Sequence, residues 1–183
     1  MRILGFSGSL RKDSHNTRLL LEAAKELPEG VEFRLFDGLR EVPPYDEDDD
    51  RDPAPPAVTR LKDELTAADA VFFSTPEYNF SVPGQLKNAI DWASRPSGQS
   101  VLKFTPVAVV GASTGAYGAV WAQAELRKVL GSCGARVVEG EVALGHAQQH
   151  FTDGQPLSED TRTQLRELLT ALIAEVQQKP LAA

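Results

Sequence analysis

Short apolar segments alternate along this chain with amphipathic helical segments, and this alternation constrains the fold more than any other sequence feature. Most of the apolar segments carry hydrophobic residues at consecutive positions, which is typical of strands buried on both faces of a parallel sheet. The pattern therefore predicts an α/β protein in three layers, with helices on both faces of one sheet. Strands are predicted over residues 2–7, 31–36, 70–73 and 107–110, with a fifth strand within 136–142, and helices over 16–27, 57–68, 83–94, 117–131 and 158–178.

Polar loops follow the first, third and fourth predicted strands, over residues 7–17, 74–81 and 111–118. In an open α/β sheet, ligands bind outside the carboxyl ends of the strands, where the strand order reverses. The three loops can form one site only if strands 1, 3 and 4 are neighbours. The order 2-1-3-4-5 meets this condition, whereas the order 3-2-1-4-5 separates strand 3 from strand 4. We therefore expect a flavodoxin-like three-layer sandwich with a five-stranded parallel sheet in the order 2-1-3-4-5.

The first loop has the composition of an anion-binding site. It ends at the start of a helix, whose free N–H groups and dipole attract negative charge. A guanidinium adds a charged planar fork, and hydroxyl and amide groups add donors. Helix capping by Ser14 and Asn16 is the competing explanation, and it leaves Arg11 unexplained. The loop contains neither Gly-x-Gly-x-x-Gly nor Gly-Lys-Ser/Thr, which favours a mononucleotide phosphate over a pyrophosphate. The candidate phosphate ligands are Ser9, Arg11, Ser14, Asn16 and Thr17.

The loops after strands 3 and 4 complete the predicted site. Pro76 fixes the chain as it leaves strand 3, and Glu77, Tyr78 and Asn79 offer polar groups and an aromatic surface to a flat ring. An ordinary polar turn with a partly buried tyrosine explains this loop equally well. The loop after strand 4 contains glycines at positions 111, 115 and 118, which permit close approach of the backbone to a ligand.

The composition of the chain excludes several other functional classes. A formal net charge of −7 disfavours nonspecific binding to nucleic acid. The lone Cys133 excludes an internal disulfide, and we expect no metal site. No apolar run is long enough for a bilayer and no leader pattern precedes the first strand, so we expect a cytoplasmic protein without membrane contact. We expect one domain over residues 1–183, in which 46–56 form an exposed acidic, proline-rich loop and 179–183 a frayed tail.

Taken together, the three loops resemble those of the NADPH-dependent FMN reductase family, which includes bacterial quinone, azo and chromate reductases. The resemblance extends from residue 2 to about residue 145. Thr114 stands where the family often has proline, and Ala119 stands where a second glycine is common. The segments that carry the resemblance are Gly8-Ser9-Leu10-Arg11-Lys12-Asp13-Ser14-His15-Asn16, Pro76-Glu77-Tyr78-Asn79 with Ser81 to Trp92, and Gly111-Ala112-Ser113-Thr114-Gly115-Ala116-Tyr117-Gly118.

The resemblance implies FMN as the cofactor and NADPH or NADH as the hydride donor. His15 is at a variable position of the family, so we expect only its backbone to take part. By position in the family motifs, the resemblance implies that the FMN phosphate is bound by Ser9, Arg11, Ser14, Asn16 and Thr17. It implies that the ribityl chain and the isoalloxazine ring are flanked by Pro76, Glu77, Tyr78 and Asn79. The other side of the flavin edge would be lined by Ser113, Gly115 and Gly118.

The implied reaction passes a hydride to FMN and then electrons to a quinone, an azo compound, a metal oxyanion or free flavin, in a ping-pong mechanism. The hydride step requires no catalytic side chain. The family also implies a homodimer or homotetramer, and we expect Asp91 and Trp92 to serve in helix packing and in a subunit contact, with Trp92 as an anchor. The alternatives are a flavodoxin-type electron carrier without NAD(P)H activity and a flavin-free scaffold. Arg11 and the Pro-Glu-Tyr-Asn segment argue against the carrier, and the intact phosphate loop argues against the scaffold.

Overall fold

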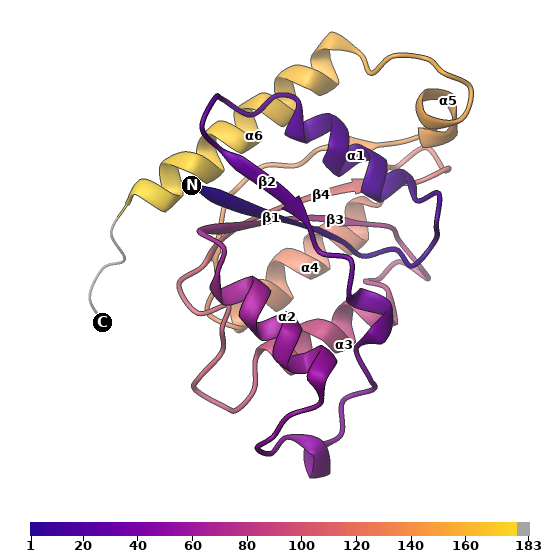
Figure 1. Ribbon diagram of the computed structural model, residues 1–183. Helices are drawn as coiled ribbons and strands as arrows, with labels where there is room; N and C mark the ends of the chain where they lie inside the picture. The colour runs from indigo at the N-terminus through magenta and orange to yellow at the C-terminus, as the bar shows by residue number, and fades with distance from the viewer. Residues whose placement is uncertain (179–183) are drawn as a thin grey trace.

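The computed structural model describes residues 1–178 and contains the predicted parallel sheet (Figure 1). Its strands follow the order β2-β1-β3-β4-β5, and β6 also pairs with β4. The predicted flavodoxin-like strand order is therefore confirmed, whereas the predicted frayed tail at 179–183 lies outside the described residues. The strands are β1 (Arg2–Ser7), β2 (Glu32–Leu35), β3 (Ala70–Thr75), β4 (Pro106–Ala112), β5 (Arg136–Val137) and β6 (Ala143–Leu144).

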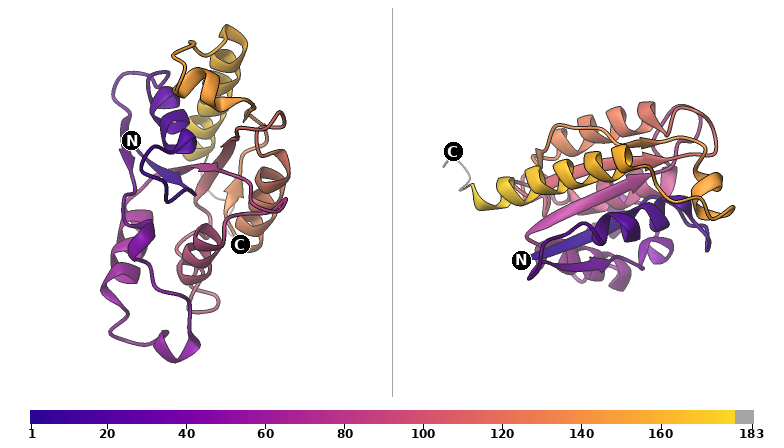
Figure 2. Two further views of the ribbon diagram at one scale, coloured as in Figure 1. Left: turned by 90° about the vertical axis from the view of Figure 1, so that its right-hand side faces the viewer. Right: turned by 90° about the horizontal axis from the view of Figure 1, so that it is seen from above.

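Helices cover both faces of this sheet, as Figures 1 and 2 show. One face carries α1 (His15–Ala24), α5 (Ala147–Phe151) and α6 (Glu159–Gln177). The other face carries α2 (Pro56–Thr66), α3 (Gly84–Ala93) and α4 (Val120–Ser132). The 3-10 turns η1 (Leu39–Glu41) and η2 (Glu47–Asp49) precede α2. None of the described helices combines the length and apolarity needed to cross a membrane.

Alternate residues of the central strands supply the two hydrophobic cores. In β3, Val71 and Phe73 pack against the helices of the α2, α3 and α4 face, whereas Ala70 and Phe72 pack against α1 and α6. Successive side chains of a strand point to opposite faces, so a strand between two helical layers must be apolar at every position. All residues of β3 and β4 are buried, and this explains the apolar runs at residues 70–73 and 107–110.

The fifth strand predicted within residues 136–142 is present as β5, which is only 2 residues long. The chain pairs with β4 at β5, leaves the sheet geometry, and pairs again at β6. Gly140, with φ of 138°, has a backbone conformation that a regular strand does not contain. The interruption is bridged from α4, where Arg127 donates from Nη1 to the Gly140 carbonyl at 3.3 Å.

Three further predictions need correction. The helix predicted from residue 117 begins at Val120, because Gly118 and Ala119 have positive φ values of 57° and 64°. The short helix α5 has no counterpart among the predicted elements. Trp92 is fully buried inside its own chain and donates its Nε1–H to the Pro43 carbonyl at 2.9 Å, so it cannot anchor a subunit contact.

The acidic segment 46–56 is mostly exposed, as expected, but it is not uniformly solvated. The residues of η2 are exposed, whereas Asp50 is only partly accessible and pairs with Arg95 at 3.5 Å. This ion pair ties the segment to the chain that follows α3.

Candidate functional site

The loops after β1, β3 and β4 meet around a hollow of about 120 Å³. It lies at the carboxyl ends of the strands, the end of the sheet that faces the viewer in the left view of Figure 2. The strand order brings these loops together, as the sequence predicted. The hollow is lined by Ser9, Arg11, Ser14, His15, Asn16, Pro76, Glu77, Tyr78, Ala112, Ser113 and Thr114.

The first loop presents hydroxyl groups and a guanidinium at the start of α1. Ser14 is buried and caps this helix, because its Oγ accepts from the Thr17 N–H at 3.3 Å. Ser9 Oγ accepts from the Arg11 N–H at 3.3 Å, which fixes the turn before the helix. Each serine keeps its own O–H to donate to an anion in the hollow. Arg11 is exposed, and its side chain lines the same space.

Asn16 joins α1 to two strands. Its Oδ1 accepts from Ser74 Oγ at 2.8 Å and from the Ala112 N–H at 2.9 Å, and its Nδ2 donates to the Ala112 carbonyl at 2.9 Å. Thr17 donates from Oγ1 to Ser7 Oγ at 2.9 Å, and it is absent from the lining of the hollow among the described residues. These contacts set the position of the loop after β1 against the sheet.

Close packing surrounds two of the glycines, by the Leu86 side chain at Gly8 and by backbone atoms at Gly118. A side chain at Gly8 would place its Cβ 2.7 Å from Leu86 Cδ2. At Gly118 a Cβ would lie 2.2 Å from the Ala143 carbonyl carbon. The loop after β4 is also held by the Gly115 carbonyl, which accepts from the His146 N–H at 2.9 Å. In the described part of the chain Gly115 and Gly118 pack against the segment around β6 and do not line the hollow, whereas Ser113 does.

The loop after β3 folds back on itself. The Tyr78 and Ser81 backbones exchange two hydrogen bonds of 3.1 Å across Asn79 and Phe80, which have φ of 54° and 60°. Positive φ at both central residues is the geometry of a type I′ turn, which asparagine tolerates well. Glu77 reaches α4, where its Oε2 accepts from the Ala122 N–H at 3.0 Å. Pro76, Glu77 and Tyr78 line the hollow; within residues 1–178, Asn79 is not part of the lining.

Three exposed aromatic side chains gather beside this site, and we call them the aromatic cluster: Phe80, Tyr117 and Trp121. The Trp121 ring lies edge-on to Phe80 and to Tyr117, with centroids 5.2 Å apart in each pair. Phe80 is 70% exposed and Tyr117 67% exposed. The contact between Glu77 and the first turn of α4 holds the loops of this cluster together. The cluster has no continuous sequence signature, because Phe80 and Tyr117 come from two different loops and Trp121 from α4.

His15 is more closely associated with the hollow than its variable position in the family suggested. It lines the hollow and is only 9% exposed. Its ring stacks on Phe151 of α5, with centroids 5.9 Å apart and planes at 21°. The sequence contained one sign of this location: His15 directly follows the N-cap Ser14 and is therefore the first residue of the helix at the hollow.

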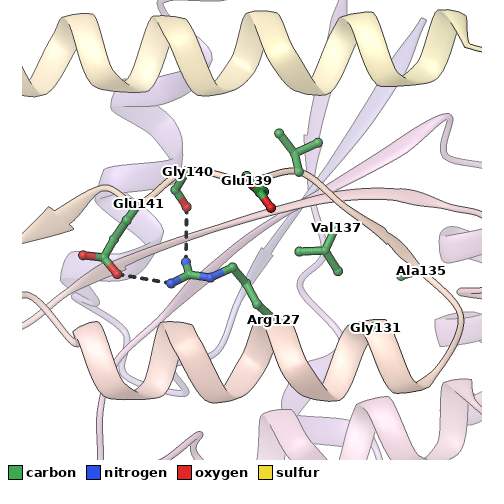
Figure 3. A pocket seen from close by; sticks show the side chains of 8 residues that line it. Arg127, Gly131, Ala135, Val137, Glu139, Gly140 and Glu141 are labelled. Atoms are coloured by element: carbon green, nitrogen blue, oxygen red, sulfur yellow. Dashed lines mark hydrogen bonds and ion pairs between the residues drawn. The ribbon is translucent and has the colours of Figure 1, made fainter.

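Other parts of the molecule offer less chemistry. A hollow of about 740 Å³ lies between α4 and the segment around β5, and Arg127 inside it pairs with Glu141 at 3.1 Å (Figure 3). Burial raises the pKa of the half-buried Cys133 thiol, which keeps it protonated and unreactive. Within residues 1–178 no group of three His, Cys, Asp or Glu side chains is placed to hold a metal ion.

Comparison with known proteins agrees with this geometry. The profile of the family described as NADPH-dependent FMN reductase matches residues 1–149. The NAD(P)H-dependent FMN reductase of Pseudomonas aeruginosa is 41% identical over 174 residues, which cover 94% of this chain and 93% of that protein. The 2-hydroxy-1,4-benzoquinone reductase of a Burkholderia species is 37% identical over 181 residues, with 98% of each chain covered.

A solved structure gives the same result. The flavoenzyme NAD(P)H:(acceptor) oxidoreductase FerB from Paracoccus denitrificans superimposes with a TM-score of 0.82 at 40% identity, over 96% of this chain and 97% of FerB. These matches favour the enzyme over the electron carrier that the sequence had left as an alternative. The chain belongs to the NADPH-dependent FMN reductase family, and it is an NAD(P)H-dependent oxidoreductase with FMN as its cofactor.

Proposed function

We propose that the hollow at the carboxyl end of the sheet holds the phosphate of FMN through Ser9, Arg11 and Ser14. The observation that carries this proposal is the convergence of two free O–H donors and a guanidinium at the first turn of α1. A helix N-terminus and a charged fork both favour a phosphate. Asn16 and Thr17 have the remaining role of holding this loop, through the contacts that their side chains make with the sheet.

We propose that the loops after β3 and β4 flank the ribityl chain and the flavin ring. Pro76, Tyr78 and Ser113 line the hollow and are the residues best placed for contact. Glu77, Asn79, Gly115 and Gly118 set the course of these two loops: Glu77 bonds α4, Asn79 occupies the tight turn, and the two glycines pack against the segment around β6.

The bound flavin supplies a ring that accepts a hydride from NAD(P)H and passes the electrons on. The chain orients that ring, and backbone N–H groups of the loop after β3 are our candidates to stabilise its reduced form. We propose that quinones are the acceptors, because curated relatives are named as a quinone reductase and a hydroxybenzoquinone reductase. Azo compounds, metal oxyanions and free flavin are further proposed acceptors. Donor and acceptor use one open site in turn, which is a ping-pong mechanism.

Steady-state kinetics of the FMN-loaded protein test this proposal. NADPH oxidation is followed at several fixed concentrations of a benzoquinone, and a ping-pong mechanism gives parallel double-reciprocal plots. Intersecting plots would contradict the ping-pong order but leave the quinone reductase activity standing. A yellow, FMN-loaded protein that oxidises no NADPH with any quinone would refute the proposed activity.

We also propose a homodimer or homotetramer in the cytoplasm, where NAD(P)H is available. The aromatic cluster supports self-association, because a contiguous exposed apolar patch marks an interaction surface. Light scattering on the wild type and on Trp121→Ala tests this assembly. A wild type that elutes as a monomer at all accessible concentrations would refute it.

A further inference from the structure

The ring of His15 is the least explained polar group at the phosphate end of the hollow. Its Nδ1 atom is buried and has no hydrogen-bond partner among the described residues. A buried polar atom without a partner is costly, and native structures normally supply one from protein, water or a ligand. Because His15 is one of the residues that line the hollow, a bound ligand is the available source of that partner.

The surroundings hold this ring in place rather than exposing it to solvent. Phe151 stacks on it, and Arg18 donates to the Phe151 carbonyl, which fastens α5 to α1. Ser14 precedes His15 and caps the same helix turn. The imidazole is therefore positioned before any ligand arrives, beside the same hollow that Ser9, Ser14 and Arg11 line.

The charges around the ring are mostly cationic. Arg11 belongs to the phosphate loop, and Arg18 belongs to α1, where it also pairs with Asp13 at 3.7 Å. From α5, the His150 ring lies edge-on to Phe151, with centroids 6.5 Å apart. From the loop after β3, Glu77 lines the same hollow, but its carboxylate bonds α4. In this setting burial, and then Arg11 and Arg18, lower the pKa of His15 below its ordinary value.

We propose that the imidazole of His15 is a ligand of the FMN phosphate and takes up a proton from solvent when the phosphate binds. This inference rests on the proposed placement of the FMN phosphate in the hollow. A phosphate adds close to two negative charges, which favour the imidazolium and counter the effect of the two arginines. The protonated ring then donates to a phosphate oxygen from a position that Phe151 fixes.

This protonation predicts how FMN affinity depends on pH. At low pH the ring is protonated with and without FMN, and the additional affinity is fully present. As pH rises through the pKa of the complex, the ring of the complex loses its proton, and the additional affinity disappears. A rise of about one pKa unit on binding corresponds to about tenfold tighter binding at the acidic limit than at the alkaline limit.

Nuclear magnetic resonance of ring-labelled histidine measures the effect directly. We expect the pKa of His15 to rise by about one unit when FMN is added and not when riboflavin is added. The ring signals of His146 and His150 are internal references in the same spectra. A His15 pKa that is equal in the free and FMN-bound protein would overturn the inference.

Affinity measurements on two variants provide the second readout. His15→Phe keeps a ring against Phe151 but has no nitrogen, and His15→Gln keeps a donor that does not titrate. The FMN phosphate titrates near about pH 6, so the informative quantity is the difference between wild type and variant. For each protein, the ratio of FMN affinity at about pH 5.5 to FMN affinity at about pH 8 is measured. We expect this ratio to be about tenfold larger for the wild type than for either variant.

An equal pH dependence in all three proteins would contradict the role of His15. Failure of the underlying phosphate site would look different, because the wild type would then bind FMN no better than riboflavin at any pH.

Discussion

Replacing Asn16 with alanine tests how the sheet fixes the phosphate loop. The buried carboxamide makes three hydrogen bonds, one with Ser74 Oγ at 2.8 Å and two with the Ala112 backbone at 2.9 Å. Truncation leaves three buried groups without these partners. Each such group costs about 1–3 kcal/mol, and water in the vacated space recovers part of this cost. We therefore expect the free energy of unfolding to fall by about 4 kcal/mol, which is large for one substitution.

Urea unfolding of the flavin-free protein, followed by circular dichroism, measures this loss. The matched control is Ser74→Ala, which removes one donor to Asn16 but leaves both Ala112 bonds intact. The control should cost about 1 kcal/mol. The denaturant dependence should stay equal in the three proteins, since the surface exposed on unfolding does not change. The reasoning is refuted if Asn16→Ala destabilises the protein by no more than Ser74→Ala does.

Three further substitutions test other parts of the structure. Ala119→Gly should raise the free energy of unfolding by about 1 kcal/mol, because alanine is unfavourable at a φ of 64°; lower stability in urea would count against this. Glu26→Gln should lower the free energy of unfolding near neutral pH but not in acid. Hydrogen bonds from Arg166 and Arg162 lower the pKa of Glu26 below 4.5. The carboxylate therefore stabilises the fold above pH 4.5, and this stabilisation is lost as pH falls through the lowered pKa. A difference in melting temperature between wild type and Glu26→Gln that does not change with pH would contradict this role of Glu26. Glu77→Ala should cost about 1 kcal/mol by uncapping α4, whereas Glu77→Gln should retain most of the stability; equal losses would argue against capping.

The central sheet was predictable because its strands have little freedom in sequence. Residues 70–73 of β3 are apolar at every position, since helices pack on both faces of this strand. The strand order followed from the chemistry of three loops that had to be neighbours. The break between β5 and β6 was not predictable, because it depends on the backbone conformation at Gly140 and on Arg127 reaching it from α4.

The site was predictable in its residue types but less so in their contacts. Asn16 was singled out as a donor, yet its partner Ala112 is 96 residues away in the sequence. The burial of His15 depends on Phe151, which belongs to a short helix without a clear sequence pattern. In both cases the side chain's surroundings come from segments that only the fold brings together.

The affinities of FMN and riboflavin for the wild type and for Arg11→Ala test the central claim most directly. The two ligands share the flavin ring and differ in the phosphate, so they separate phosphate contacts from ring contacts. A charge-assisted hydrogen bond is worth about 2 kcal/mol, so a flavin-fluorescence titration should show about 30-fold weaker FMN binding to the variant and unchanged riboflavin binding. Unchanged FMN affinity, or an equal loss for both ligands, would contradict the placement of the phosphate beside Arg11.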